Sequence, residues 1–581
     1  MMRLILFLCS LLPSIISFKI LFKRLPSKGL KLYNTIERNP SSGAYDFNQW
    51  KKAFVSQPNE FNYTIKDIKG KLPKDLEGTL FRAMPALFER GDKRYGHYLD
   101  GDGYIIKVTI SNGIVTFKSK FVKTEEYVKE NNAQKVLFRS TFRTQRKENI
   151  IADTICINNA FDLKLKNGAN TNVIFWADAL LVLFEAGVPY KLDTFSLDTL
   201  KEDDLNLGNQ LKSGMSVLVP ILKQYFPGIH DEIFGSSMTA HPKIDPVNNR
   251  LIGWTWRAKV GNSPLETNPQ LEIHEWDSLM KKELPSTTHD LMSTTVAPHD
   301  FSISENYYVF IENRVKGNTI PYILGKKCPA ECVDIIPTEN MILNLVKRPK
   351  ISKLDQSAIA GQFLTIPLTP GFTIHSVCAW EEYPSRLTLI TTAWDTQTVS
   401  SGKVKGGLLG AWQGVAPNFD DIPVTLLYRT LVDISTGQLL SHAPVEGMEK
   451  IIVEHPHVNP NYESQKARYL WMSIGSLEGI SSPPLGYLKL DLETGDSQKW
   501  FAPLHNYCEE LVIVPKSKVN DDDLLSEDDV YLIATIFNAN INKSKIAIFD
   551  GKDMCEPLCE LPLDHQLPHS LHGCFTKSII E

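Results

Sequence analysis

The chain is 581 residues long, and its 43% hydrophobic and 22% charged residues predict a globular protein with a large buried core. The formal net charge of −5 provides no basic surplus for a phosphate backbone, which argues against nucleic acid as a partner. Length alone leaves the number of domains open, because a repetitive all-β architecture can hold this many residues in one domain.

The N-terminal residues differ in composition from the rest. Residues 1–18 are strongly apolar, and no Asp or Glu occurs before Glu37, whereas several Lys and Arg do. We predict a targeting presequence over residues 1–36, a signal-like segment followed by a transit-like one, as in algae whose plastids lie behind extra membranes. The expected location is a plastid, peripheral to its membranes. The alternatives are an endomembrane anchor or the cytoplasm; Lys19 and Lys23 leave an apolar run shorter than the about 20 residues that span a bilayer.

Strand signals fill the chain after residue 75, which predicts an all-β fold. The apolar or β-branched runs are 171–185, 249–258, 301–314, 386–394, 424–434, 467–475, 486–493, 530–537 and 544–550. A degenerate repeat recurs at 191–200, 431–439, 489–500 and 548–554, in which an apolar strand ends in Asp before a polar turn and a further strand. An Asp that accepts backbone N–H groups and a Gly with positive φ suit the outer hairpin of a propeller blade. The repeat is too degenerate to count the blades.

Two further segments carry local predictions. Residues 205–235 are expected to form one or two amphipathic helices, which either pack on the propeller or dip into a membrane surface. The stretch LDGDGY at 99–104 resembles a calcium loop but has no acidic residue at the last ligand position, so a tight hairpin turn is the favoured interpretation.

Nine cysteines, one of them in the presequence, are too scattered for a disulfide framework. Cys328 with Cys332 and Cys555 with Cys559 share a spacing that could build a four-thiolate zinc site. Spacing alone is weak support for zinc. Reduced thiols on two surface loops, or a local disulfide, are the favoured alternatives.

Fourteen histidines remain as candidates for a metal site. Four of them flank strand-like segments far apart in the chain: His241, His299, His375 and His572. A closed radial fold can bring such distant residues together, because the inner strands of a propeller face a common axis. Further histidines lie in comparable places, namely His455, His457, His565 and His569, so spacing cannot choose among them.

A resemblance to a known family distinguishes among these histidines. The blocks GTLFRAMP, RYGHYLDGDG, FVKTEEYV, LKNGANTNV, LFEAGVPYKLD, TAHPKIDP, HDFSISENY, VEHPHVNP, EELVIVP and LHGCF occur in the order typical of the carotenoid cleavage oxygenases, also called the retinal-pigment-epithelium membrane protein superfamily. The chain resembles this family over residues 50–581, apart from the insertion at 205–235. The resemblance implies a seven-bladed β-propeller with a helical and loop cap over one axial Fe²⁺.

The resemblance also implies the site residues. The metal ligands would be His241, His299, His375 and His572. Glu185, Glu454 and Glu510 would accept hydrogen bonds from the ligand imidazoles, with Glu509 as the neighbouring alternative to Glu510, and the methyl group of Thr171 would face a vacant coordination position. The chain departs from the family pattern at Cys378, which could alter packing or polarity near the metal, and at Leu511, which is expected only to relax the start of a strand.

The implied activity is that of a non-haem iron(II) dioxygenase, which uses dioxygen to split a C=C double bond of a carotenoid or apocarotenoid into two carbonyl products. Because such substrates dissolve in lipid, peripheral membrane contact is expected at the tunnel mouth, with 205–235 as the candidate segment. The alternatives are a stilbene-cleaving oxygenase and an oxygen-independent isomerase. A non-catalytic propeller scaffold would be expected to lose a metal histidine, and this chain keeps all four.

Overall fold

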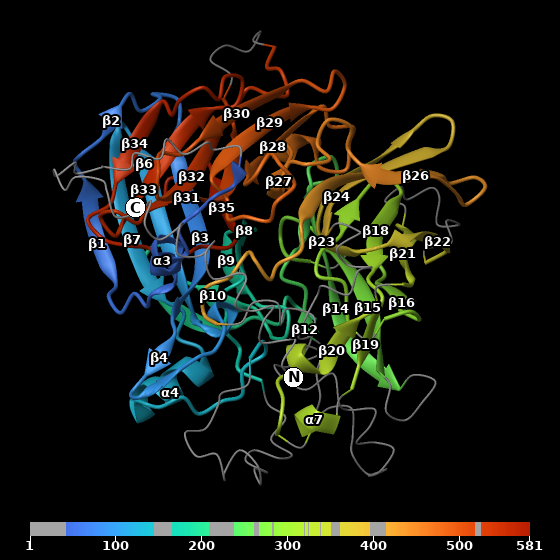
Figure 1. Cartoon of the computed structure of the whole chain (residues 1–581), viewed down its shortest axis with the longest axis horizontal. Coiled ribbons are helices and arrows are strands. Elements are labelled where there is room, and N and C mark those ends of the chain that lie inside the picture. Colours follow the sequence, from blue (N-terminus) through green and yellow to red (C-terminus); the bar gives the residue numbers. More distant parts are fainter. Residues whose placement is uncertain are drawn as a thin grey trace, which may run out of the picture. The chain divides into compact units, whose positions relative to one another are not determined.

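The computed structural model describes residues 42–143, 165–207, 237–260, 267–281, 284–294, 296–318, 320–323, 325–336, 338–349, 361–394, 414–517 and 524–581. The predicted presequence and most of the predicted helical insertion lie outside these residues. Residues Pro40–Glu581 form one compact unit. Within it, seven antiparallel sheets of four or five strands form a seven-bladed β-propeller, which confirms the predicted fold class (Figure 1).

The first four blades follow chain order. Blade 1 contains β1 (Phe61–Ile65), β3 (Gly78–Leu87), β6 (Asp102–Ser111), β7 (Ile114–Phe121) and β35 (Gly573–Thr576); blade 2 contains β8 (Asn172–Trp176), β9 (Ala179–Leu183), β10 (Tyr190–Leu192) and β11 (Thr199–Glu202). Blade 3 contains β12 (Ser237–Met238), β13 (Lys243–Asp245), β14 (Arg250–Val260), β15 (Thr267–Trp276) and β16 (Thr287–Asp290); blade 4 contains β17 (Ser302–Ile303), β18 (Tyr307–Glu312), β21 (Asn340–Lys347) and β22 (Phe363–Pro370).

The last three blades complete the ring. Blade 5 contains β23 (Phe372–Glu382), β24 (Arg386–Trp394), β25 (Thr425–Asp433) and β26 (Gln438–Pro444); blade 6 contains β27 (Val453–His457), β28 (Tyr469–Ile474), β29 (Gly486–Asp491) and β30 (Ser497–Phe501); blade 7 contains β31 (Asn506–Pro515), β32 (Val530–Asn538), β33 (Lys543–Asp550), β34 (Cys559–Pro562) and β2 (Lys69–Gly70).

Short elements occur between the blades. Two small sheets pair β4 (Glu89–Arg90) with β5 (Lys93–Arg94) and β19 (Val315–Gly317) with β20 (Val333–Ile335). The helices are α3 (Phe47–Trp50), α4 (Glu125–Ala133) and α7 (Ile320–Ile323), with 3₁₀ turns η2 (Lys51–Phe54), η3 (Tyr98–Asp100), η5 (Ala330–Cys332) and η6 (Pro460–Tyr462). In the part of the chain that is described, no helix is long and apolar enough to cross a membrane.

Both ends of the compact unit close the ring. The C-terminal β35 pairs with β3 of blade 1, where Thr79 lies opposite Thr576, and the N-terminal β2 pairs with β34 of blade 7, where Lys69 lies opposite Glu560. Figure 1 shows the result, with blue N-terminal strands lying against red C-terminal ones. The first and last blades are therefore joined by hydrogen bonds at the inner edge of one and the outer edge of the other.

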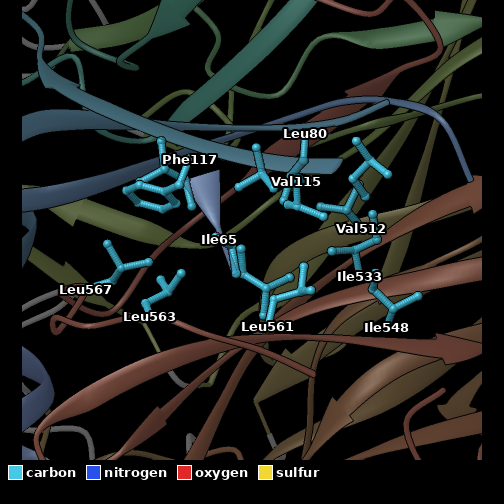
Figure 2. Close-up of a cluster of buried hydrophobic side chains, with 14 of the residues drawn as sticks. Ile65, Leu80, Val115, Phe117, Val512, Ile533, Ile548, Leu561, Leu563 and Leu567 are labelled. Atoms are coloured by element: carbon cyan, nitrogen blue, oxygen red, sulfur yellow. The ribbon is translucent and has the colours of Figure 1, made fainter. Parts of the chain in front are cut away.

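An apolar core fills the space between these two blades. Leu80 and Phe117 come from blade 1 and Val512, Ile533 and Leu561 from blade 7, and all five side chains are buried in one cluster (Figure 2). Neighbouring blades pack face to face, so their central strands are buried on both sides and read as nearly continuous apolar runs. This packing explains why strand signals were visible throughout the sequence.

The predicted repeat forms the outer hairpins. Asp433 ends β25 and accepts a hydrogen bond from the backbone N–H of Ser435 at 2.9 Å, and Gly437 before β26 has a φ of +70°. Asp491 plays the same part between β29 and β30, where Gly495 has a φ of +79°. The turn chemistry inferred from the sequence is confirmed at both hairpins.

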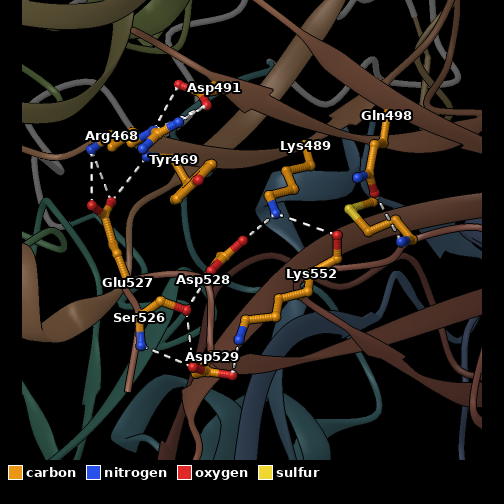
Figure 3. Close-up of polar contacts among 12 residues, drawn as sticks. Arg468, Tyr469, Lys489, Asp491, Gln498, Ser526, Glu527, Asp528, Asp529 and Lys552 are labelled. Atoms are coloured by element: carbon orange, nitrogen blue, oxygen red, sulfur yellow. Dashed lines mark hydrogen bonds and ion pairs between the residues drawn. The ribbon is translucent and has the colours of Figure 1, made fainter. Parts of the chain in front are cut away.

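Polar contacts fasten the outer parts of blades 6 and 7 (Figure 3). The Glu527 carboxylate accepts the backbone N–H groups of Arg468 and Tyr469, both at 2.9 Å. Lys489 of β29 forms an ion pair with Asp528 at 2.6 Å. These contacts hold the segment before β32 against the neighbouring blade.

A buried ion-pair network joins blades 3 and 4. The Arg348 side chain follows β21, is 4% exposed, and contacts Asp245 at 2.7 Å and Glu275 at 3.0 Å. Its Nη1 also donates to the carbonyl of Ser304 at 2.8 Å. Because its charge is balanced within the interface, the guanidinium can be buried there, although removing one partner of such a network is costly.

The hairpin predicted at residues 99–104 is wrong. The segment is a 3₁₀ turn, η3, that leads directly into β6. The Asp100 carboxylate instead accepts backbone N–H groups from Thr141 at 2.9 Å and from Phe142 at 3.0 Å, while Asp102 is held in buried ion pairs. Short-range sequence could not reveal these distant partners, which fix the loop that covers one side of the central cavity.

Candidate metal centre

Four blades each direct one histidine toward the propeller axis. His241 follows β12, His299 precedes β17, His375 lies in β23 and His572 immediately precedes β35. One ring nitrogen from each of them lies within 4.8 Å of the others. Nitrogens bound at about 2.1 Å to one metal ion lie at most about 4.2 Å apart, so a cluster within 4.8 Å approaches the size of a metal site and a small inward shift would complete it.

The rings meet mostly edge to face. The centroid of the His241 ring lies 4.3 Å from that of His299, 4.5 Å from that of His572 and 5.6 Å from that of His375, with interplanar angles of 62°, 80° and 60°. Imidazoles that bind one metal ion must point their nitrogen atoms at one position, and rings inclined to one another can do so without stacking.

Three blades supply a carboxylate to three of these rings. Nδ1 of His375 lies 2.9 Å from Oε2 of Glu454, and Nδ1 of His572 lies 2.7 Å from Oε1 of Glu510. Nδ1 of His299 is paired with Glu185. A carboxylate accepts a hydrogen bond from a protonated Nδ1. Each contact therefore favours the tautomer whose Nε2 lone pair is free for a metal.

His241 is the exception, because no carboxylate of the described residues contacts its ring. Its Nε2 is buried and has no hydrogen-bond partner. Burial and the neighbouring His299 hold the pKa of His241 well below its ordinary value, so the ring is neutral and keeps a lone pair. A buried nitrogen without a partner is costly unless a ligand satisfies it, and a metal ion fits that requirement.

The carboxylates and imidazoles around the centre have pKa values that are shifted in different directions. Burial would raise the pKa of Glu510, but the imidazoles of His572 and His457 outweigh it and hold that pKa well below the usual range. Burial dominates at Glu454 and raises its pKa. At His299, the attraction of Glu185 outweighs burial and raises the pKa of the imidazole.

Strand irregularities coincide with the functional side chains. The register of β23 shifts between Thr373 and Ser376, around His375, and the register of β27 shifts after Glu454. β31 shifts between Cys508 and Leu511, which brackets Glu510. Bulges re-aim side chains locally, and here they occur on inner strands where the axis is approached.

The two departures from the family pattern lie in core positions. Cys378 is buried in β23 within the cluster between blades 5 and 6, and the cavity wall does not include it. Leu511 is buried inside β31, so the expectation that it marks the start of a strand is wrong. Local amino-acid composition does not distinguish the start of a strand from a bulge within it, and Leu511 lies at such a bulge.

An apolar cavity of about 420 Å³ opens beside the histidines. His299, His375 and His572 line it together with Thr171, whose carbonyl accepts the backbone N–H of His572 at 3.3 Å. The aromatic part of the wall consists of Trp50, Tyr98, Phe142, Phe184, Trp254, Trp256, Tyr322, Phe372, Trp394 and Phe419. Such a wall suits an apolar, unsaturated ligand and excludes water from the metal position.

Several neighbours of the centre were not singled out by sequence. Nε2 of His457 lies 2.9 Å from the Glu510 carboxylate, and the fully buried Arg82 places Nη2 3.7 Å from the same group. His455 lies beside the cluster and lines the cavity. A resemblance based on ligands carries no signal for such neighbours, because their roles depend on the fold.

The two cysteine pairs stand apart from this centre. Cys328, Cys332, Cys555 and Cys559 are all free thiols, and Cys555 alone of the four is exposed. Within the described ranges, the groups of side chains that could hold a metal contain no cysteine. The thiols are reduced, as favoured by sequence, but their predicted place on surface loops is wrong for three of them, because Cys328 and Cys332 are buried and the buried Cys559 begins β34.

A propeller whose axis carries four convergent imidazoles next to an apolar cavity defines a class of protein with a candidate metal centre at the hub. The family model described as retinal pigment epithelial membrane protein matches residues 54–577, and the chain belongs to that family. The resemblance inferred from sequence is confirmed.

Curated relatives give the general chemistry of the family. The chain is 29% identical to the apocarotenoid-15,15'-oxygenase of Synechocystis sp., covering 93% of this chain and 98% of the relative. It is 25% identical to the carotenoid 9,10(9',10')-cleavage dioxygenase 1 of Pisum sativum, covering 88% and 86%. It is 22% identical to resveratrol cleavage oxygenase 1 of Botryotinia fuckeliana, covering 87% and 81%.

Solved structures share the architecture. A variant of the Synechocystis apocarotenoid oxygenase matches with a TM-score of 0.76 and 28% identity, covering 92% of this chain and 99% of that one. A cobalt-substituted form of the Synechocystis enzyme matches with a TM-score of 0.75 over the same shares of the two chains, also at 28% identity. These similarities support the class of carotenoid and apocarotenoid cleavage oxygenases for this chain.

Proposed function

We propose that this protein is a non-haem iron(II) dioxygenase that cleaves a C=C double bond of a carotenoid or apocarotenoid into two carbonyl products. The observation that carries the proposal is the convergence of four histidine nitrogens within 4.8 Å beside an apolar cavity. The similarity to the apocarotenoid oxygenase over nearly the whole of both chains favours the same class of substrate.

The chain's own residues account for binding and orientation. His241, His299, His375 and His572 would hold the metal, and the carboxylates of Glu185, Glu454 and Glu510 would keep three of the rings in the binding tautomer. Bound iron(II) would supply the activation of dioxygen that oxidative cleavage requires. The aromatic wall would align one double bond beside the centre and exclude water.

Two alternative reactions use the same arrangement. A stilbene-cleaving oxygenase is favoured by the similarity to the resveratrol cleavage oxygenase, although the identity is lower. An isomerase acting on the same site would not need dioxygen. Product formation under argon and under air separates the isomerase from both oxygenases, and a comparison of apocarotenal with resveratrol as substrates separates the two oxygenases.

The test is metal content and oxygen-dependent cleavage of the full chain, purified anaerobically in detergent after ferrous supply. His299→Ala removes one candidate ligand, and His505→Ala, an exposed histidine bonded to Asn540, is the matched control. We expect close to one iron per chain in the wild type and the control, and loss in His299→Ala. Equal iron in all three, or no iron in the wild type, would overturn the proposal.

We further propose delivery to a plastid and peripheral contact with its membranes. The acid-free N-terminal composition supports the first, and the lipid solubility of the proposed substrate supports the second. A fluorescent fusion of residues 1–50 should accumulate in plastids. Cytosolic fluorescence would contradict the presequence, and failure of the full chain to float with lipid vesicles would contradict the membrane contact.

A further inference from the structure

A fifth histidine lies beside the four-histidine centre. His455 follows Glu454 in β27 and lines the same cavity as His375 and His572. The centroid of its ring lies 5.2 Å from that of His375 and 5.6 Å from that of His572. The rings of His375 and His572 themselves are 5.4 Å apart, so His455 approaches the centre as closely as its members approach each other.

His455 is nevertheless not part of the ligand set. The nitrogens that lie within 4.8 Å of one another come from His241, His299, His375 and His572. The ring of His455 shares such a distance only with His375 and Glu454. It is therefore a neighbour of the metal position, on the side that faces the cavity.

The ring has an unmet hydrogen-bonding requirement. Nδ1 of His455 is buried and has no partner, whereas the nearby His457 is bonded to Glu510. A buried polar atom without a partner costs about 1–3 kcal/mol, so a purely structural histidine at this place would be expected to bond to the protein. Nε2 of His241 shows the same pattern, and there the proposed metal supplies the missing partner.

The backbone at His455 adopts an uncommon conformation. Its φ of +50° lies in the left-handed region, which few residues other than glycine adopt, although histidine, like asparagine and aspartate, is found there more often than most. Its N–H donates to the Glu454 carboxylate at 3.2 Å, and the register of β27 shifts between Glu454 and His457. Local strain that the surrounding structure maintains is typical of functional positions.

The ring can donate a hydrogen bond whatever its tautomer, because every form of an imidazole side chain carries at least one N–H. In the otherwise largely apolar wall of the cavity, this makes His455 a potential donor beside the centre.

We propose that His455 is a positioning residue that donates a hydrogen bond from its ring N–H to a small diatomic ligand of the dioxygen class, held at the open side of the four-histidine centre. The inference rests on the proposed function. Its ring lies next to two ligand rings, so it reaches what is bound at the centre, whereas a polar group at the far end of a long polyene lies beyond it.

The experiment measures binding of nitric oxide, a diatomic probe, to the iron(II)-loaded full chain under argon. His455→Phe keeps a planar ring and removes the donor, His455→Gln restores a donor, and His505→Ala, which does not line the cavity, is again the control. We expect the dissociation constant of nitric oxide to rise about tenfold in His455→Phe, the loss of one hydrogen bond, and to recover to within about threefold in His455→Gln. The electron paramagnetic resonance spectrum of the complex should change in His455→Phe only.

The outcomes separate this inference from the proposed function. Equal affinity and equal spectra in all variants that hold iron would overturn the inference alone. Loss of iron from His455→Phe as severe as from His299→Ala would also overturn it, because His455 would then be a ligand. A wild-type chain without iron would overturn both proposals. Should His455→Phe fail to fold, His455→Gly, which tolerates the positive φ, takes its place.

Discussion

Glu510 and Glu454 each contact a ligand imidazole, but replacing each of them with Gln should change the stability of the metal-free protein differently. Glu510 is 2% exposed and receives hydrogen bonds from His572 and His457, with Arg82 near its second oxygen. Glu454 contacts His375 and the backbone of His455. We predict that Glu510→Gln and Glu454→Gln both weaken metal binding, by about 10-fold to 100-fold, because each removes the charge that orients a ligand ring.

The metal-free proteins should differ. The pKa of Glu510 is held well below its usual range, so the folded state favours its ionised form. Charge-assisted hydrogen bonds contribute about 1.5–3 kcal/mol and are about twice as strong as neutral ones, so losing the charge at two imidazole contacts should cost about 2 kcal/mol. The pKa of Glu454 is raised because burial outweighs its contacts. Glu454→Gln should therefore leave the free energy of unfolding unchanged or slightly higher.

The sign of the pH dependence follows from the same shifts. The stability due to Glu510 is present above about pH 4.3, the ordinary value for Glu, and is lost as pH falls through its lowered folded pKa. The ionised form of Glu454 costs stability at neutral pH, a cost that disappears as pH falls below its raised folded pKa. Urea unfolding of the chelated proteins, followed from pH 7 down to about pH 3, measures both contributions. Equal destabilisation by the two variants would refute the reasoning.

Further predictions concern the cavity, the blade interface and the metal. Thr171→Ser keeps the hydroxyl group and removes the methyl group; iron content should stay the same, whereas cleavage per dioxygen consumed, followed with an oxygen electrode and chromatography, should fall. Arg348→Met removes the cation that two buried carboxylates share and should lower the free energy of unfolding by about 3–5 kcal/mol, against less than about 0.5 kcal/mol for Lys129→Met in an exposed pair. An undiminished unfolding free energy in Arg348→Met would contradict this. Chelation of the metal should lower the melting temperature by roughly 2 °C, because a metal at 100 times its dissociation constant stabilises the folded protein by about 2.7 kcal/mol. Iron(II) but not Mg²⁺ should restore the melting temperature. An unchanged melting curve would argue against a bound metal.

The fold was predictable because its signals are local. Strands such as β25 and β29 show apolar runs that end in Asp, and the turns that follow use the Asp and Gly chemistry read from the sequence. The number of blades was not readable from this repeat, because closure depends on β2 and β35, short strands that pair with partners hundreds of residues away. That number came from the family resemblance.

The candidate metal centre was also predictable only in part. The ligand histidines were chosen by resemblance, since His241 and His455 look alike as isolated residues beside strands. Their difference is tertiary: four blades bring one nitrogen each to a common point, and His455 stays next to it. The contacts of Arg82 and His457 with Glu510 were not predictable, because Glu510 lies in blade 7 while its partners come from blades 1 and 6.

The propeller gives a physical reason for a site with four imidazoles and three carboxylates. Each of the seven blades contributes one of these side chains: Glu185 from blade 2, His241, His299 and His375 from blades 3 to 5, Glu454 and Glu510 from blades 6 and 7, and His572 from blade 1. A buried hub favours compensated charges, because an uncompensated charge is costly at low dielectric. A ligand set without a carboxylate is therefore compatible with the proposed metal, because Glu185, Glu454 and Glu510 supply negative charge one layer further out.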